Sequence, residues 1–212
     1  MKKKKTLDTL VKDIYNKLDT LTEGKSLGVS DETATAFGES MKQALLGWSG
    51  EHPVNKPTLR MSNIGKPNRQ LWYDMKSKAK TKSFSAPVQI KFLYGHILEE
   101  VVLFLARLAK HEVTDEQKEV NVDGIKGHMD CKIDGEVIDV KTASGFAFKK
   151  FKDGTLPDDD PFGYMAQIAG YEENEGTTDG GFLTLNKENG ELTLFRPDEL
   201  DKPNIKDRIK LL

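Results

Sequence analysis

The stretch GHMDCKIDGEVIDVKTAS, residues 127–144, predicts two short β-strands joined by a tight turn. The dipeptide Asp134-Gly135 at its centre is typical of a two-residue type I′ turn, which pairs the residues on either side as a hairpin. With this turn, alternate residues of both strands share one face of the hairpin. That face is apolar and we expect it to lie against the core; it carries Met129, Cys131, Ile138 and Val140.

The opposite face of the predicted hairpin is charged, with Asp130 opposite Asp139 and His128 opposite Lys141. Directly opposed side chains have Cβ atoms about 5 Å apart, and like charges at that distance destabilise a sheet. A divalent cation would remove the repulsion, since magnesium is usually held by one or two carboxylates together with water and phosphate oxygens. A solvated polar face explains these four residues alone equally well, because Asp-x-Lys is a weak pattern.

The composition is that of a soluble globular protein, with 37% hydrophobic and 31% charged residues. A chain of 212 residues suffices for one domain with a real core. The sequence has no apolar run near the roughly 20 residues of a membrane span, and no apolar region of a secretory signal follows the opening lysines. We therefore expect a cytoplasmic protein with no membrane partner. The single cysteine, Cys131, cannot build a disulfide framework or a zinc site alone.

The net charge of −2 argues against bulk coating of nucleic acid, which usually needs a basic surface. It leaves room for a local basic patch that grips a phosphate backbone. Lysines and arginines do cluster, although each cluster is more simply explained as solvated surface: the clusters are residues 2–5, 60–69, 76–82 and 149–152.

Periodicity predicts a helical first part and a mixed second part. Expected helices cover residues 6–22, about 30–48, a short stretch within 62–77, about 88–109, and a stretch that begins at Asp160-Pro161. Expected strands cover residues 117–122, 126–133, 136–142, 181–186 and 191–196. This order indicates an α/β fold with a mixed sheet between helices. We expect a helical N-terminal extension over residues 1–50 and the main domain over 51–212, within one compact unit.

Four motifs in order resemble the PD-(D/E)XK nuclease superfamily. GHMD at 127–130 followed by IDVK at 138–141 resembles its core, and GHILE at 95–99 is similar to the G-x-x-x-E motif of the RecB-like branch. QIAGY at 167–171 is similar to the Q-x-x-x-Y motif of that branch, and LRMSNIGKPNRQLWY at 59–73 to its opening segment. The resemblance covers about residues 59–196 and implies a restriction-endonuclease-like mixed sheet flanked by helices. Stand-alone exonucleases of phage type look most similar.

The resemblance implies a site for one or two Mg²⁺ or Mn²⁺ ions. Its implied ligands are Glu99, Asp130, Asp139 and the carbonyl of Val140. Lys141 looks like the catalytic lysine of the family, beside the catalytic carboxylates. His96 is the candidate for a further ligand, as in some RecB-like members, and Glu100 is the alternative to Glu99. An iron–sulfur cluster, which some of these nucleases carry, is not expected with one cysteine.

Contacts to the substrate are implied for several polar residues. Gln167 and Tyr171, one helical turn apart, resemble a pair that braces the site and touches substrate, although helix-to-sheet packing explains them as well. The segment of Arg60 and Arg69 approaches nucleic acid in the family. Residues 144–154 interleave phenylalanines with Lys149 and Lys150, which suits a single-strand contact or, more simply, a surface loop that buries its phenylalanines.

Together these features predict a metal-dependent DNA exonuclease, of the kind that phages use in DNA degradation, recombination or replication. Its expected partner is DNA with linear ends, single- or double-stranded, with a single-strand-binding or recombination protein as a further candidate. A structure-specific endonuclease on the same fold, a non-catalytic DNA-binding module and a metal-binding scaffold protein are the alternatives.

Overall fold

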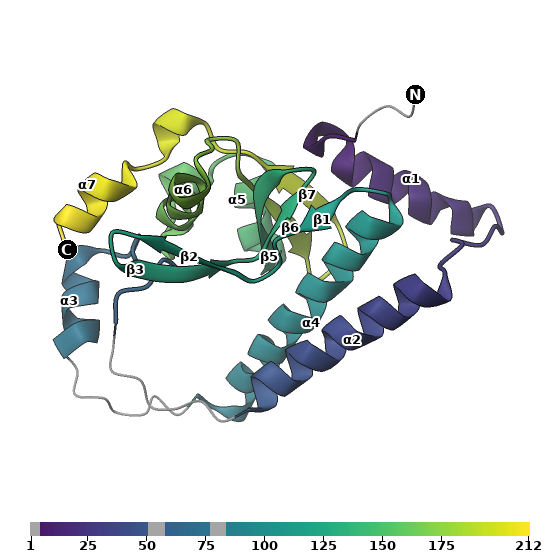
Figure 1. The fold of residues 1–212 in the computed structure, drawn as a ribbon, viewed down its shortest axis with the longest axis horizontal. Coiled ribbons are helices and arrows are strands. Elements are labelled where there is room, and N and C mark those ends of the chain that lie inside the picture. Colours follow the sequence, from purple (N-terminus) through teal and green to yellow (C-terminus); the bar gives the residue numbers. More distant parts are fainter. Residues whose placement is uncertain (1–4, 51–57, 77–83) are drawn as a thin grey trace.

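The computed structural model describes residues 5–50, 58–76 and 84–212. At its centre lies a five-stranded sheet in the order β1-β4-β5-β6-β7. The strands are β1 (Val113–Thr114), β4 (Cys131–Ile133), β5 (Glu136–Ala143), β6 (Gly181–Asn186) and β7 (Leu192–Phe195). Strands β5 and β6 are parallel and the other neighbours are antiparallel. The mixed sheet flanked by helices that the sequence predicts is therefore confirmed (Figure 1).

The hairpin β4–β5 has the predicted turn and register. Cys131 pairs with Ile138, and Ile133 pairs with Glu136. Asp134 and Gly135 both have positive φ, at 54° and 94°, as a type I′ turn requires. Glycine reaches such values freely and aspartate tolerates them, so the dipeptide suits its place.

The predicted strand over residues 126–133 is wrong in one respect, because it breaks at Asp130. Residues before the break form β3 (Ile125–Met129), which pairs with β2 (Lys118–Val122) in a separate two-stranded sheet. Within that sheet His128 lies opposite Glu119, and not opposite Lys141. The break has a local cause: the Asp130 carboxylate accepts the Val140 N–H at 2.7 Å, where a longer β4 would have offered a backbone carbonyl.

Two apolar clusters cover the two faces of the sheet. On one face, helix α4 (Ala86–Leu108), the 3₁₀ turn η1 (Leu7–Thr9) and helix α1 (Leu10–Thr22) pack on Cys131, Ile138 and Val140. On the other face, helices α5 (Gly145–Lys152) and α6 (Tyr164–Glu175) pack with Val137 and Phe182. Successive residues of β5 alternate between the clusters, as strand geometry requires. Met129 lies in the second cluster, so its predicted place beside Cys131 is also wrong.

The first 50 residues divide into a core helix and a peripheral one. Leu7, Leu10 and Ile14 are each at most 1% exposed and belong to the cluster on the α4 face. Helix α2 (Asp31–Ser49) begins at Ser30, whose hydroxyl accepts the Thr33 N–H, and runs beside α4 away from the sheet (Figure 1). The expected linker at 50–57 lies almost wholly outside the described residues. The division into residues 1–50 and 51–212 stays a prediction.

Helix boundaries differ from the predicted ones at two places. The helix expected at Asp160-Pro161 begins at Tyr164 instead, because the Asp160 carboxylate accepts the N–H groups of Gly163 and Met165 at 2.9 and 2.8 Å and so caps the turn before it. Residues 145–152, interpreted as a loop, form α5. The sequence also left unpredicted β1, the short turns η2 (Leu156–Asp158) and η3 (Glu199–Asp201), and helix α7 (Ile205–Lys210). The predicted short helix is α3 (Asn68–Lys76).

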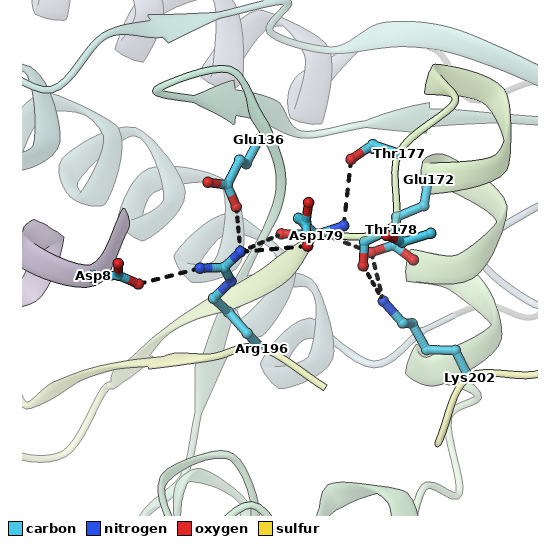
Figure 2. Close-up of polar contacts among 9 residues, drawn as sticks. Asp8, Glu136, Glu172, Thr177, Thr178, Asp179, Arg196 and Lys202 are labelled. Atoms are coloured by element: carbon cyan, nitrogen blue, oxygen red, sulfur yellow. Dashed lines mark hydrogen bonds and ion pairs between the residues drawn. The ribbon is translucent and has the colours of Figure 1, made fainter. Parts of the chain in front are cut away.

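Charged side chains tie the C-terminal segment to the rest of the molecule (Figure 2). Arg196, which follows β7, lies 3.3 Å from an Asp8 carboxylate oxygen and donates to Glu136 at 2.7 Å. Lys202 donates to the Glu172 carboxylate at 2.8 Å, and both of these side chains are about 5% exposed. These pairs hold the segment after β7 against η1, the hairpin and α6. Across the described part of the chain, no helix has the length and apolar character that crossing a bilayer requires.

Candidate active site

Strand β5 sets Asp139 and Lys141 on the face of the sheet that α6 covers. Asp139 is 0% exposed in the middle of the strand, between β4 and β6. Lys141 lies two residues further on the same face, and its Nζ contacts a carboxylate oxygen of Asp139. The same Nζ donates to Gln167 Oε1 at 3.4 Å and lies 4.6 Å from the centre of the Tyr164 ring.

Two further carboxylates come from outside β5. Asp130 lies at the break between β3 and β4, with its side chain on the Val140 N–H. Glu99 lies in the middle of α4 and accepts a hydrogen bond from Gln117 Nε2 at 2.9 Å. Gln117 also donates its backbone N–H to the Asp130 carbonyl at 2.9 Å. Sequence reasoning missed Gln117, which links the helix carboxylate to the strand break.

The three carboxylates repel one another in a poorly hydrated place. Burial, together with the charges of Glu100 and Asp139, raises the pKa of Glu99 to about 7. Burial and the charges of Asp139 and Glu99 raise the pKa of Asp130, and burial raises that of Asp139 although Lys141 opposes it. Burial alone would lower the pKa of Lys141, but the negative charge of Asp139 and Asp130 outweighs burial and raises it. One lysine therefore faces an excess of carboxylates.

The donor chemistry of this cluster fits a divalent cation. Carboxylate oxygens are the ligands that Mg²⁺ and Mn²⁺ prefer. Asp139 Oδ1 is buried and has no hydrogen-bond partner among the described residues. In the described ranges, however, no three His, Cys, Asp or Glu side chains are placed so that they could hold one ion. The carboxylates instead occupy hydrogen bonds and ion pairs with Gln117, the Val140 N–H and Lys141.

The two other residues named for a metal differ in setting. His96 is exposed on α4, about one turn before Glu99. Val140 belongs to the apolar cluster on the α4 face, and its N–H donates a hydrogen bond to the Asp130 carboxylate. Glu100, the alternative to Glu99, has its Oε2 buried with no partner within the part of the chain that is described. Ligand roles for these residues stay predictions.

Gln167 and Tyr171 connect the lysine to the interior of α6. Gln167 Nε2 donates to the Tyr171 hydroxyl at 2.8 Å, and Gln167 Oε1 accepts from Lys141. Both side chains are buried, at 7% and 1% exposure, and burial raises the pKa of Tyr171. The predicted pair is thus in contact with the predicted lysine, and it also packs against the sheet.

The basic residues predicted to contact substrate lie nearer the surface. Arg60 and Arg69 are exposed, and the Arg69 guanidinium lies 5.8 Å from the centre of the Tyr73 ring. Lys149 is exposed on α5, whereas Lys150 donates to the Asp159 carboxylate at 2.5 Å. Phe148 and Phe151 of that helix are buried, whereas Phe146 is 79% exposed.

Residue Arg208 of α7 fixes the segment after Arg60, and sequence reasoning missed it. Its guanidinium donates to the carbonyls of Ile64 and Lys66 at 2.9 and 2.6 Å. The same segment approaches the start of α6 so closely that a Cβ at Gly65 would lie 2.4 Å from the Gly163 Cα. Only glycine fits there, and the contact places the Arg60–Arg69 segment next to α6.

Comparison with known proteins identifies the fold. No protein-family model matches the sequence, and no curated protein matches it either. Among solved structures, an alkaline exonuclease (LHK-Exo) from Laribacter hongkongensis is similar, with a TM-score of 0.50 and 15% identity over 74% of this chain and 86% of that one. LHK-Exo in complex with dAMP gives a TM-score of 0.47 and 12% identity over the same shares. This chain therefore has the fold of that exonuclease.

Proposed function

We propose that this protein is a metal-dependent DNA exonuclease of phage type. The observation that carries the proposal is the set of three carboxylates, Glu99, Asp130 and Asp139, on which the charge of one lysine acts, on a fold shared with an exonuclease. Carboxylates whose pKa values are raised together by burial and mutual repulsion are typical of functional sites. Structural ion pairs instead balance their charges. The cluster is thus better explained by a cation and a phosphate than by stability.

The chain's own residues have distinct parts in the proposed reaction. Glu99, Asp130 and Asp139 would hold Mg²⁺ or Mn²⁺, which when bound supplies Lewis acidity and offsets phosphate charge. Lys141, whose pKa is raised, keeps its proton at neutral pH. It therefore suits electrostatic stabilisation of the phosphate, and orientation of the attacking water, more than removal of a proton. Gln167 fixes the Lys141 ammonium, and Tyr171 fixes Gln167.

Substrate contacts form the less constrained part of the proposal. Exposed Arg60, Arg69 and Lys149 are proposed to contact the DNA backbone. Lys150 is proposed to contact the DNA backbone at the same surface. Its contribution to DNA binding should be smaller, because Asp159 already offsets its charge. A recombination or single-strand-binding partner, a phage source and a cytoplasmic setting stay predictions.

Digestion of end-labelled DNA tests the proposal. The substrates are linear single- and double-stranded DNA labelled at the 5′ or 3′ end, with a covalently closed circle beside them, in Mg²⁺, Mn²⁺ or chelator. We expect mononucleotide release from one end only, no attack on the circle and no reaction in chelator. Asp139→Ala and Lys141→Ala should each lose roughly 10²–10³-fold or more in rate. Lys12→Ala, at an exposed position of α1, is the matched control.

Each alternative function has its own outcome in this experiment. Cleavage of the closed circle indicates a structure-specific endonuclease. Binding of DNA without cleavage in any metal indicates a non-catalytic module, and binding of Mn²⁺ without affinity for DNA indicates a metal-binding scaffold. A wild-type rate for the Asp139→Ala variant contradicts the proposed site.

A further inference from the structure

A small cavity of about 190 Å³ lies directly beside the candidate active site. Its walls come from the end of β5, from α5 and from residues 156–164, and Lys141 lines it together with Ser144, Lys150 and Phe162. Phe162, one of the lining residues, is 59% exposed to solvent. It adjoins the lysine of the site but contains none of the three carboxylates.

Two stacked aromatic rings line the cavity beside the lysine. The Phe162 and Tyr164 rings are stacked, with centroids 5.4 Å apart and planes 25° apart. Lys141 Nζ lies 4.6 Å from the centroid of the Tyr164 ring. Phe151, which is buried, lies behind Tyr164 at a centroid distance of 6.1 Å. A ligand in the cavity would therefore contact an aromatic surface that itself contacts the reacting lysine.

The charges around the cavity favour a neutral ring over a phosphate. Lys150 donates to the Asp159 carboxylate at 2.5 Å and to the Asp159 carbonyl at 3.0 Å. Its positive charge is thus offset, and the pair fixes residues 156–164 against α5. The remaining lining is mostly apolar or aromatic, from side chains such as Leu156, Pro161 and Phe162. Aromatic faces of this kind bind nucleobases by stacking, whatever the base.

We infer that this cavity takes the nucleobase of the nucleotide about to be released, stacked on Phe162, while the backbone of that nucleotide passes Lys141. The inference rests on the proposed exonuclease function. The volume is below the roughly 300–1,000 Å³ of sites for drug-sized ligands, so it suits one ring system and not an oligonucleotide. Stacking accepts all four bases, as an exonuclease that digests any sequence needs.

Removal of the base from the substrate, combined with removal of the ring from the protein, tests the inference. The substrates are linear DNA with an intact or an abasic terminal nucleotide at the end that the wild type digests, and the measurement is kcat/KM for release of that nucleotide. We expect about a tenfold loss from the abasic end, about a tenfold loss from Phe162→Ala, and no further loss when both are combined. Independent losses that multiply to about a hundredfold overturn the inference.

Two variants sharpen this cycle. Phe146→Ala is the matched control, since Phe146 is 79% exposed on α5 and does not line the cavity; this variant should keep the full loss at an abasic end. Phe162→Trp should restore both the rate and its dependence on the terminal base, because it keeps an aromatic face. A Phe162→Trp variant as slow as Phe162→Ala contradicts stacking.

A binding measurement separates this inference from the proposed function. DNA with 2-aminopurine as its terminal base is mixed with protein in chelator, where no digestion is expected. We expect fluorescence quenching with wild-type protein and little with Phe162→Ala. If Phe162→Ala loses the quenching but the wild type digests no DNA in any metal, the result supports base binding in the cavity and rejects the proposed nuclease activity. Equal quenching in both proteins, or equal digestion of intact and abasic ends, rejects the cavity whether or not the protein is a nuclease.

Discussion

The hairpin β4–β5 buries charged groups at both of its ends, with opposite results. At the turn, Asp134 accepts from the Glu112 N–H at 3.1 Å and lies 2.6 Å from His111 Nδ1. The other ring nitrogen of His111 lies 3.2 Å from Asp13 of α1, which Lys5 also contacts at 2.5 Å. Each buried group there has a partner of suitable charge or hydrogen-bonding type.

The open end of the hairpin has the reverse arrangement. Asp130, Asp139 and Glu99 share one lysine. Burial raises the pKa of all three, and the charges of neighbouring carboxylates raise the pKa of Asp130 and Glu99 further. A buried charge without a partner costs free energy, so such a cluster needs a ligand to balance it. The difference teaches that burial alone does not distinguish a functional cluster from a structural one, whereas the balance of charges does.

Removal of His111 should give the largest effect on stability. The His111 side chain is 0% exposed, and His111→Ala would leave Asp13 and Asp134 without their shared partner. We expect a loss of about 3 kcal/mol in the free energy of unfolding, because one member of a buried pair is removed. Tm should fall by roughly 6–12 °C in a chain of this size. Thermal and urea unfolding measure both quantities.

The control for this variant is His128→Ala, at an exposed position of β3, which should change stability by less than about 0.5 kcal/mol. Nuclease activity below the Tm should be the same in His111→Ala as in the wild type. An unchanged Tm in His111→Ala would show that the contacts of His111 do not hold the turn end, and would remove the contrast between the two ends.

The same substitution at the two ends should change stability in opposite directions. Asp139→Asn removes a buried carboxylate whose pKa folding raises, so we expect a gain in the free energy of unfolding at pH 8 in chelator. A raised pKa means that stability is lost as pH rises through the folded value, so the gain should shrink as pH falls to the unfolded value of about 3.9 and below it. Asp134→Asn, at the paired end, should lose stability. Urea unfolding at both pH values measures the effect.

Cation binding gives this comparison a second measurement. Mg²⁺ or Mn²⁺ should raise the Tm of the wild type, since a ligand that binds only the folded state stabilises it. The rise should be absent in Asp139→Asn and intact in Asp134→Asn. An equal metal-dependent rise in all three proteins would place any bound ion away from Asp139.

The sequence pattern was sufficient to predict the turn and register of the hairpin. It was insufficient where contacts between distant segments determine the local structure. Asp134-Gly135 specifies its turn by local backbone preference, so the register follows from a few neighbouring residues. Helix α5 has eight residues and begins with glycine, so local propensity for it is weak, and packing of Phe151 against the sheet holds it. The break at Asp130 depends on a hydrogen bond to Val140, which strand periodicity does not encode.

The candidate site follows the same rule. Asp139, Lys141 and Gln167, which the motifs single out, are in contact, because β5 and α6 each carry their residues at fixed spacing. Gln117 and Arg208 were not predicted, since their partners Glu99 and Ile64 are distant in the sequence and come close only in the folded chain. Gln117 has a positive φ of 52°, which is uncommon for a residue other than glycine. Nothing in the neighbouring sequence favours this conformation, so it is visible only in the structure.

The smallest expected effect concerns Glu175, at the end of α6, whose carboxylate pairs with a lysine in the middle of β4. Lys132 of β4 lies 2.5 Å from a carboxylate oxygen of Glu175, and Lys118 donates to the same group. Burial alone would raise the pKa of Glu175, but hydrogen bonds from Lys132 and Lys118 outweigh it and lower the pKa to about 2. Glu175→Gln should therefore cost about 1 kcal/mol at pH 7, after allowance for solvent screening of the lysines.

The pH dependence of that loss separates charge from hydrogen bonding. A lowered pKa stabilises the fold above the unfolded value of about 4.3, and the stabilisation is lost as pH falls towards 2. The difference between wild type and Glu175→Gln in urea unfolding should thus be constant from pH 7 to 5 and shrink by pH 3. Glu173→Gln, which removes a more exposed pair with Lys206, is the control with little effect at any pH. A Glu175→Gln loss that is the same at pH 3 as at pH 7 would assign the stabilisation to neutral hydrogen bonds, and charge balance would then no longer distinguish the paired carboxylates from those around Lys141.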